Sequence, residues 1–135
     1  MIHNVWSILC REVLTDQETN SMNYIHCIEE SSTSVVPSLM FPINVGTLWE
    51  KDTTTEELFM VRIVLVYPSG IQKPLLQTKA IPFTEMRQRI NFKLNELQIE
   101  EFGRHELRVE IESNENWHIV SRLPLVLKKL VKKQE

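Results

Sequence analysis

The side chains best suited to chemistry are the two cysteines, Cys10 and Cys27, because paired thiols form disulfides or bind metals. A polar turn centred between Glu18 and Thr19 joins two predicted antiparallel strands, and this centre pairs positions whose numbers sum to 37. Cys10 then lies directly opposite Cys27. Such neighbours form a cross-strand disulfide, hold a metal with His26, or pack as small buried hydrophobes. In a cytosolic protein we expect the last, with both thiols reduced.

Metal and cofactor sites are not indicated by the sequence. His26 points to the opposite face of its strand from Cys27, and no Cys-X-X-Cys or His-X-His spacing occurs. Asp16 and Asp52 are the only aspartates, so nothing matches the Asp-lined calcium loops of C2 sandwiches. Three glycines are too few to favour a phosphate-cradling loop. We expect no metal and no cofactor.

The four histidines, His3, His26, His105 and His118, are dispersed along the chain and adjoin no nucleophile motif. No Gly-X-Ser-X-Gly occurs, and the run 31–34 has the composition of a loop. We therefore predict no catalytic residues, although a triad assembled only in space would leave no such motif.

An alternating charged face is predicted near the C-terminal end, where Glu106, Glu110 and Glu112 share one side of a strand with Arg108. Such a face favours solubility, and it also suits a basic partner. Glu106, Arg108 and Glu110 are accordingly the candidate binding residues.

The tryptophans Trp6, Trp49 and Trp117 each fall on the apolar side of an alternating run, so we expect all three in the core. Aromatic residues make up 7% of the chain. With its tryptophans in the core, the chain has no aromatic platform for stacking sugars or bases.

Length and charge set the remaining bounds. The chain has 135 residues, which suits one domain, predicted over residues 1–128. Its net charge of −3 gives no field that would attract nucleic acid. No apolar run is long enough to span a membrane, and the start lacks the apolar core of a signal peptide. We expect a cytoplasmic protein that contacts neither nucleic acid nor membrane.

The predicted tail covers residues 129–135. Basic residues cluster in this tail and directly before it; they are Lys128, Lys129, Lys132 and Lys133. The cluster suits an acidic partner or lipid head groups, but a solvated terminus is the simpler interpretation.

About eight period-two runs separated by turn residues predict an all-β protein. The run 58–67 is almost continuously apolar and predicts a central strand covered on both faces, or a strand at a sheet junction. The run 39–49 contains Pro42 and predicts an edge or bulged strand. The stretch 88–128 predicts three alternating strands of one half-buried antiparallel sheet. Because prolines require edges, we expect an antiparallel β-sandwich, immunoglobulin-like or C2-like, in preference to a closed barrel.

The segment 101–107, Glu-Phe-Gly-Arg-His-Glu-Leu, resembles the Asp-X-Gly-X-Tyr-X-Cys corner of immunoglobulin domains. Glu101 matches the acid and Gly103 the turn glycine, whereas His105 replaces the tyrosine and Leu107 the cysteine. The resemblance implies a hairpin with His105 facing inward as a structural residue and without the intersheet disulfide.

Over its full length the chain resembles an uncharacterised group of small bacterial β-sandwich proteins. The residues that carry the resemblance are Trp6-Ser7-Ile8-Leu9-Cys10, Asp16-Gln17-Glu18-Thr19-Asn20, the strand from Phe41-Pro42 to Leu48-Trp49, and the Gly103 hairpin. The resemblance implies a fold and no activity.

The expected function is protein contact, as a non-catalytic interaction module or subunit of a bacterial assembly. A partner strand or a second copy would bind along an edge strand. One alternative is a small-ligand binder or hydrolase with a pocket between the sheets, near the loop 53–57. Another is a structural protein of a phage or virus.

Overall fold

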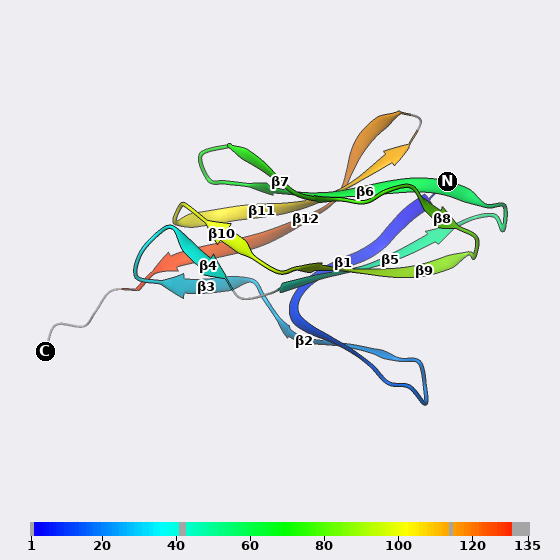
Figure 1. The fold of residues 1–135 in the computed structure, drawn as a ribbon, viewed down its shortest axis with the longest axis horizontal. Helices are drawn as coiled ribbons and strands as arrows, with labels where there is room; N and C mark the ends of the chain where they lie inside the picture. The colour runs from blue at the N-terminus through cyan, green and yellow to red at the C-terminus, as the bar shows by residue number, and fades with distance from the viewer. Residues whose placement is uncertain (1, 41–42, 114, 131–135) are drawn as a thin grey trace, which may run out of the picture.

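The computed structural model describes residues 2–40, 43–113 and 115–130, and these residues form strands and connections with no helix (Figure 1). The prediction of an all-β protein is confirmed. Four of the twelve strands have only three or four residues. In chain order the strands are β1 (Ile2–Thr15), β2 (Met22–Cys27), β3 (Glu30–Thr33), β4 (Ser38–Met40), β5 (Ile43–Lys51), β6 (Glu57–Val66), β7 (Gln72–Gln77), β8 (Ile81–Phe83), β9 (Arg87–Leu94), β10 (Leu97–Ile99), β11 (Gly103–Ser113) and β12 (Asn116–Lys129).

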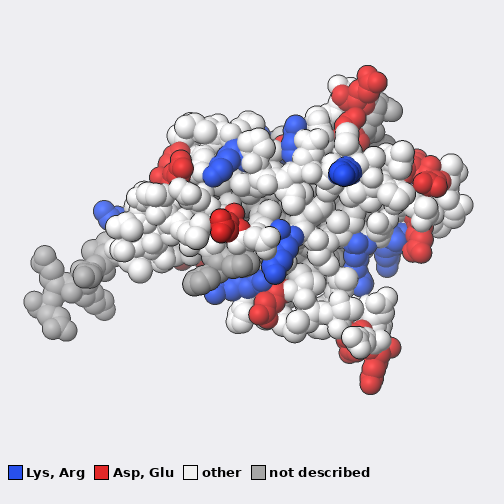
Figure 2. All heavy atoms as spheres, in the orientation of Figure 1, with Lys and Arg blue, Asp and Glu red and all other residues white. Residues whose placement is uncertain are grey.

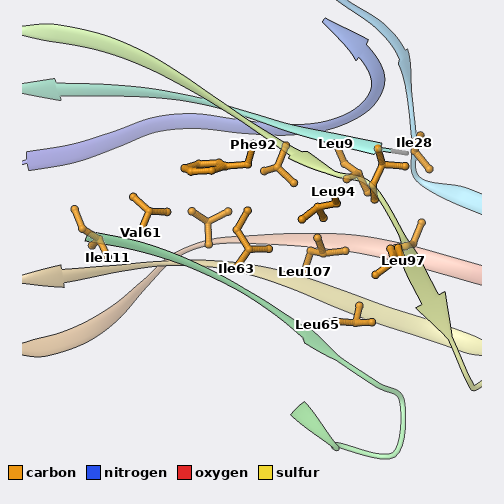
Figure 3. Close-up of a cluster of buried hydrophobic side chains, with 14 of the residues drawn as sticks. Leu9, Ile28, Val61, Ile63, Leu65, Phe92, Leu94, Leu97, Leu107 and Ile111 are labelled. Atoms are coloured by element: carbon orange, nitrogen blue, oxygen red, sulfur yellow. The ribbon is translucent and has the colours of Figure 1, made fainter. Parts of the chain in front are cut away.

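Two larger sheets enclose the core. One has the order β2-β1-β5-β9, the other has the order β3-β12-β11-β6-β7 with β8 also paired to β6, and β10 pairs with β4 in a separate ribbon. Figure 3 shows Phe92 and Leu94 of the first sheet facing Val61, Ile63 and Leu107 of the second. All of these side chains belong to one buried apolar cluster, whose removal from water is the main force that holds the sheets together.

Strand β6 is the central strand that the apolar run 58–67 predicted. It lies between β11 on one side and β7 and β8 on the other. Val61, Ile63 and Leu65 alternate into the core and are fully buried. Pro74 and Pro82 lie in β7 and β8, which pair with β6 alone in the described part of the chain, so both prolines have the edge position expected of them.

The run 39–49, predicted as one edge or bulged strand, contributes to two described strands. It divides into β4, which pairs with β10, and β5, which lies between β1 and β9. The division falls at residues 41–42, which lie outside the described residues. β5 is free of proline over its whole length, and it can therefore occupy an interior position of the sheet.

The stretch 88–128 also departs from its prediction. Its first strand, β9, pairs with β5 in one sheet, whereas β11 and β12 form a hairpin in the other. The short strand β10 carries the chain between the two sheets. Alternation of apolar and polar residues indicates that a strand has one buried face, but it does not indicate which sheet contains the strand.

His105 has the inward orientation that the corner predicted. The side chain is fully buried, its Nδ1 lies 3.1 Å from the carbonyl oxygen of Gly103, and its ring packs edge-on against Tyr67. Gly103 has a φ of 119°, a conformation that residues with a Cβ rarely adopt. The imidazole of His105 thus packs inside the protein at this corner.

The first hairpin has the predicted register, with Cys10 directly opposite Cys27. The hairpin also folds over the outer face of β5 and β9, where Tyr24 packs on Gly46 and donates a hydrogen bond to Asn91. This arrangement positions the aromatic ring of Tyr24 over the sheet and covers part of its outer face.

The expectation that all three tryptophans lie in the core is correct only for Trp49, which is fully buried. Trp6 is partly exposed and packs edge-on against Tyr24 under the first hairpin. Trp117 is partly exposed and packs against Arg62 on the outer face of the second sheet. Trp6 and Trp117 therefore cover outer faces, which the alternation alone did not distinguish from the core side.

The end of the chain is described only as far as Leu130. Lys128 and Lys129 belong to β12, and Lys128 pairs with Glu30 at 3.0 Å. Lys132 and Lys133 of the predicted tail lie outside the described residues. No helix among the described residues has the length and hydropathy needed to cross a membrane.

Candidate functional site

A groove of about 1020 Å³ opens between the start of β1 and the starts of β6 and β12. It lies where the β11–β12 hairpin extends away from β6, at the end of the molecule that contains the N-terminus (Figure 1). The lining residues come from both large sheets, which places the groove between them. They are Ile2, His3, Asn4, Glu57, Leu58, Phe59, Met60, Ala80, Ile111, Glu112, His118 and Val120.

The floor of the groove is apolar. Phe59 and Ile111 are buried core residues, and Ile2 and Val120 are partly buried and pack against the same cluster. Leu58 stands at the rim and is 67% exposed, the largest fraction among the exposed large apolar side chains of the described residues. Leu58 thus adds one exposed apolar side chain beside the apolar floor.

The polar groups of the groove stand around this floor. Nε2 of His3 lies 4.0 Å from a carboxylate oxygen of Asp52, and both side chains are largely exposed. His118 is paired with Ile111 across the β11–β12 ladder, and Glu112 follows Ile111. Imidazole, amide and carboxylate groups beside an apolar floor can orient a ligand by hydrogen bonds.

Two strand edges border the groove. β1 pairs with β5 from Ile2 onward, but its pairing with β2 on the other side begins only at Cys10. β12 pairs with β11 along its length, but with β3 only from Val126. Within the described residues, 2–8 of β1 and 117–123 of β12 therefore have one edge to which no strand is paired by backbone hydrogen bonds, although the two segments lie near each other. Such edges present unpaired backbone N–H and C=O groups.

A side-chain bond holds the two edges in place. Oγ of Ser121 in β12 donates to Oδ1 of Asn4 in β1 at 2.7 Å. The amide nitrogen of Asn4 in turn donates to the carbonyl oxygens of Trp6 and Leu48, at the point where the register of β1 shifts. The position of β1 beside β12 is thus fixed next to the groove.

The predicted binding face of Glu106, Arg108 and Glu110 lies on the outer side of the second sheet and is separate from the groove. Glu106 accepts hydrogen bonds from Arg108 at 2.7 Å and from Arg122 at 2.9 Å. The bond from Arg108 is the main cause that lowers the pKa of the Glu106 carboxyl below its usual value. The carboxylate is therefore ionised and engaged within its own sheet.

Glu110 belongs to a second cluster on the same face. It is buried, and its carboxylate accepts a hydrogen bond from Arg62 at 2.8 Å. The guanidinium of Arg62 lies 4.2 Å from the ring centre of Trp117. The charges of this face are thus matched by neighbours, as in a face that stabilises its own sheet.

The cysteines do not form a chemical centre with neighbouring residues. Both are free thiols, but the expectation that both are buried is correct only for Cys10, which is fully buried, and wrong for Cys27, which is exposed. Burial raises the pKa of the Cys10 thiol, which keeps it protonated. In the described part of the chain, no three His, Cys, Asp or Glu side chains lie close enough to hold a metal ion.

Sequence reasoning approached the groove at only one point, the loop 53–57, whose last residue Glu57 lines it. His3 and His118 appeared dispersed because 115 positions separate them in the chain, and only the sheet topology brings them to one groove. An exposed leucine at position 58, directly after a polar loop, is the signal that points to the rim.

Comparisons with protein-family models and with curated proteins give no match for this chain. Among solved structures, the chain is similar to the Pseudomonas fluorescens alkylpurine DNA glycosylase AlkC bound to DNA containing an abasic site analog. The TM-score is 0.53 and the identity 16%, over 74% of this chain and 27% of the glycosylase chain. The chain thus matches about a quarter of that protein, and the likeness is one of fold.

Proposed function

We propose that this protein is a non-catalytic β-sandwich interaction module, immunoglobulin-like or C2-like, that binds an extended segment of a protein partner in the groove between β1 and β12. The observation that carries the proposal is the apolar groove bordered by two strand edges. An extended segment hydrogen-bonds to such an edge and inserts alternate side chains into the adjoining groove.

The chemistry of the groove supports a protein partner over a nucleic acid. Glu57 and Glu112 line it, and among its described lining residues no lysine or arginine occurs. Carboxylates repel the phosphate backbone on which nucleic-acid binding depends. The DNA bound by the similar glycosylase is therefore not assigned as a ligand to this chain. A cytosolic place of action fits the two free thiols.

A small ligand is the second candidate for the same groove. Its volume of about 1020 Å³ lies at the upper end of the range, roughly 300–1,000 Å³, that small-molecule sites occupy. The strand edges favour the extended peptide, because its backbone can form a row of hydrogen bonds with them, whereas a small ligand cannot.

The proposal is tested by selecting phage-displayed peptides on the immobilised protein and measuring their affinity for two variants. Leu58→Arg places a charge at the rim and is expected to weaken binding at least tenfold, since it blocks an apolar contact. Ile71→Arg is the matched control, because Ile71 is 61% exposed in the turn between β6 and β7 and does not line the groove. Peptides that bind both variants equally, or that fail to be selected at all, contradict the proposal.

A further inference from the structure

The rim of the groove is acidic. Glu57 and Glu112 line it, exposed Glu56 directly precedes Glu57 in the chain, and a carboxylate oxygen of exposed Asp52 lies 4.0 Å from Nε2 of the lining residue His3. Figure 2 shows acidic side chains at the end of the molecule where β6 begins and at the tip of the β11–β12 hairpin. A segment that combines apolar side chains with lysines would match both the floor and the rim.

The chain itself contains such a segment. Residues 130–135 read Leu-Val-Lys-Lys-Gln-Glu, with two neighbouring apolar residues followed by two lysines. Leu130, the last described residue, is 57% exposed at the end of β12. Its apolar start suits a floor of Ile2, Phe59, Ile111 and Val120, and Lys132 and Lys133 would complement the carboxylates of the rim.

This segment cannot reach the groove of its own molecule. Figure 1 shows that β12 ends at the opposite end of the molecule from the start of β1. His118 of the groove and Lys129 are eleven positions apart in β12, about 36 Å at roughly 3.3 Å per residue, whereas six residues span at most about 21 Å. The segment is therefore available only to the groove of another molecule.

We propose that residues 130–135 of one copy bind in the β1–β12 groove of a second copy. This inference rests on the proposed function, for which it names the occupant of the groove. The two surfaces are different parts of the molecule, so the contact is head-to-tail. Repetition of such a contact gives rings where the rotation closes and open chains where it does not.

The first test is sedimentation velocity of the full chain over rising protein concentration. The wild-type chain is expected to form dimers and larger species, and the variant Lys132→Glu/Lys133→Glu to remain monomeric. Glu112→Lys is expected to prevent association as well, and its combination with the two lysine reversals to restore it. Glu18→Lys is the matched control, since Glu18 lies exposed in the turn of the first hairpin, remote from the groove.

The second test uses a fluorescein-labelled peptide of sequence Leu-Val-Lys-Lys-Gln-Glu and the full-chain Lys132→Glu/Lys133→Glu variant as its receptor. Adding Glu112→Gln is expected to weaken peptide binding by up to about fivefold, the size of one partly exposed ion pair. Adding Glu18→Gln is expected to leave it unchanged. High salt is expected to weaken binding by screening the same charges.

The outcomes test the proposed occupant of the groove separately from the proposed function of the groove. If the labelled peptide does not bind and the wild-type chain remains monomeric, the assignment of residues 130–135 is wrong. If phage-selected peptides nevertheless bind in a Leu58-dependent way, the groove still binds extended segments and only the occupant is wrong. If neither kind of peptide binds, both proposals fail.

Discussion

Replacement of Trp49 by alanine is expected to remove about 3–5 kcal/mol of stability, the cost of deleting a large fully buried side chain. Trp49 packs against Phe59 across the core, and its Nε1 donates to Oγ of Thr47 at 2.7 Å. The hydroxyl of Thr47 in turn donates to the carbonyl oxygen of Ile90 in β9. The substitution therefore opens a cavity and leaves a buried hydroxyl without one of its partners.

The loss is large compared with the roughly 5–15 kcal/mol that separates folded from unfolded domains of this kind. Urea denaturation followed by fluorescence measures it. Trp117→Ala is the matched control: Trp117 packs with Arg62 on an outer face, and a cation–π contact of this kind is worth about 1 kcal/mol or less. Equal losses for the two variants would contradict the placement of these tryptophans.

Replacement of Gly46 by alanine is expected to displace the first hairpin and to cost about 1–3 kcal/mol, as overpacking commonly does. An added Cβ would lie 2.3 Å from Cε1 of Tyr24, so the tyrosine ring has to move. Movement of that ring disturbs its edge-on contact with Trp6 and its hydrogen bond to Asn91. Thermal unfolding and the near-ultraviolet signal of the tryptophans both report the change.

A double-mutant cycle identifies the cause. In a Tyr24→Ala background the clash is absent, so Gly46→Ala is expected to cost nothing there, or to stabilise β5 by reducing the freedom of the unfolded chain. A cost that is the same in both backgrounds would mean that Tyr24 does not pack on Gly46, and that the hairpin does not cover the sheet as described.

Local patterns predicted those parts of the fold that depend on neighbouring residues. The turn centred between Glu18 and Thr19 determined the pairing of Cys10 with Cys27, because an antiparallel hairpin has one register for a given turn. The almost continuous apolar run of β6 predicted a central strand, and β6 pairs with β11 on one side and with β7 and β8 on the other.

The parts that were missed depend on long-range topology. Trp117 alternates with Leu123 and Leu125 as a core residue would, but the register shift between Val109 and Glu110 interrupts that alternation, and Trp117 packs against Arg62 on the outer face. The groove joins the starts of β1 and β6 to residues of β11 and β12, which only the arrangement of the two sheets brings together. The spacing of residues within a single strand does not predict which strands lie side by side.

The central claim is that the groove binds an extended segment along the edges of β1 and β12. Amide hydrogen exchange with and without a saturating phage-selected peptide tests it most directly. We expect slowed exchange in residues 2–8 and 117–123, which have one edge without backbone pairing in the described part of the chain. Protection confined to the Glu106 face, or an exchange pattern that the peptide leaves unchanged, would contradict the claim.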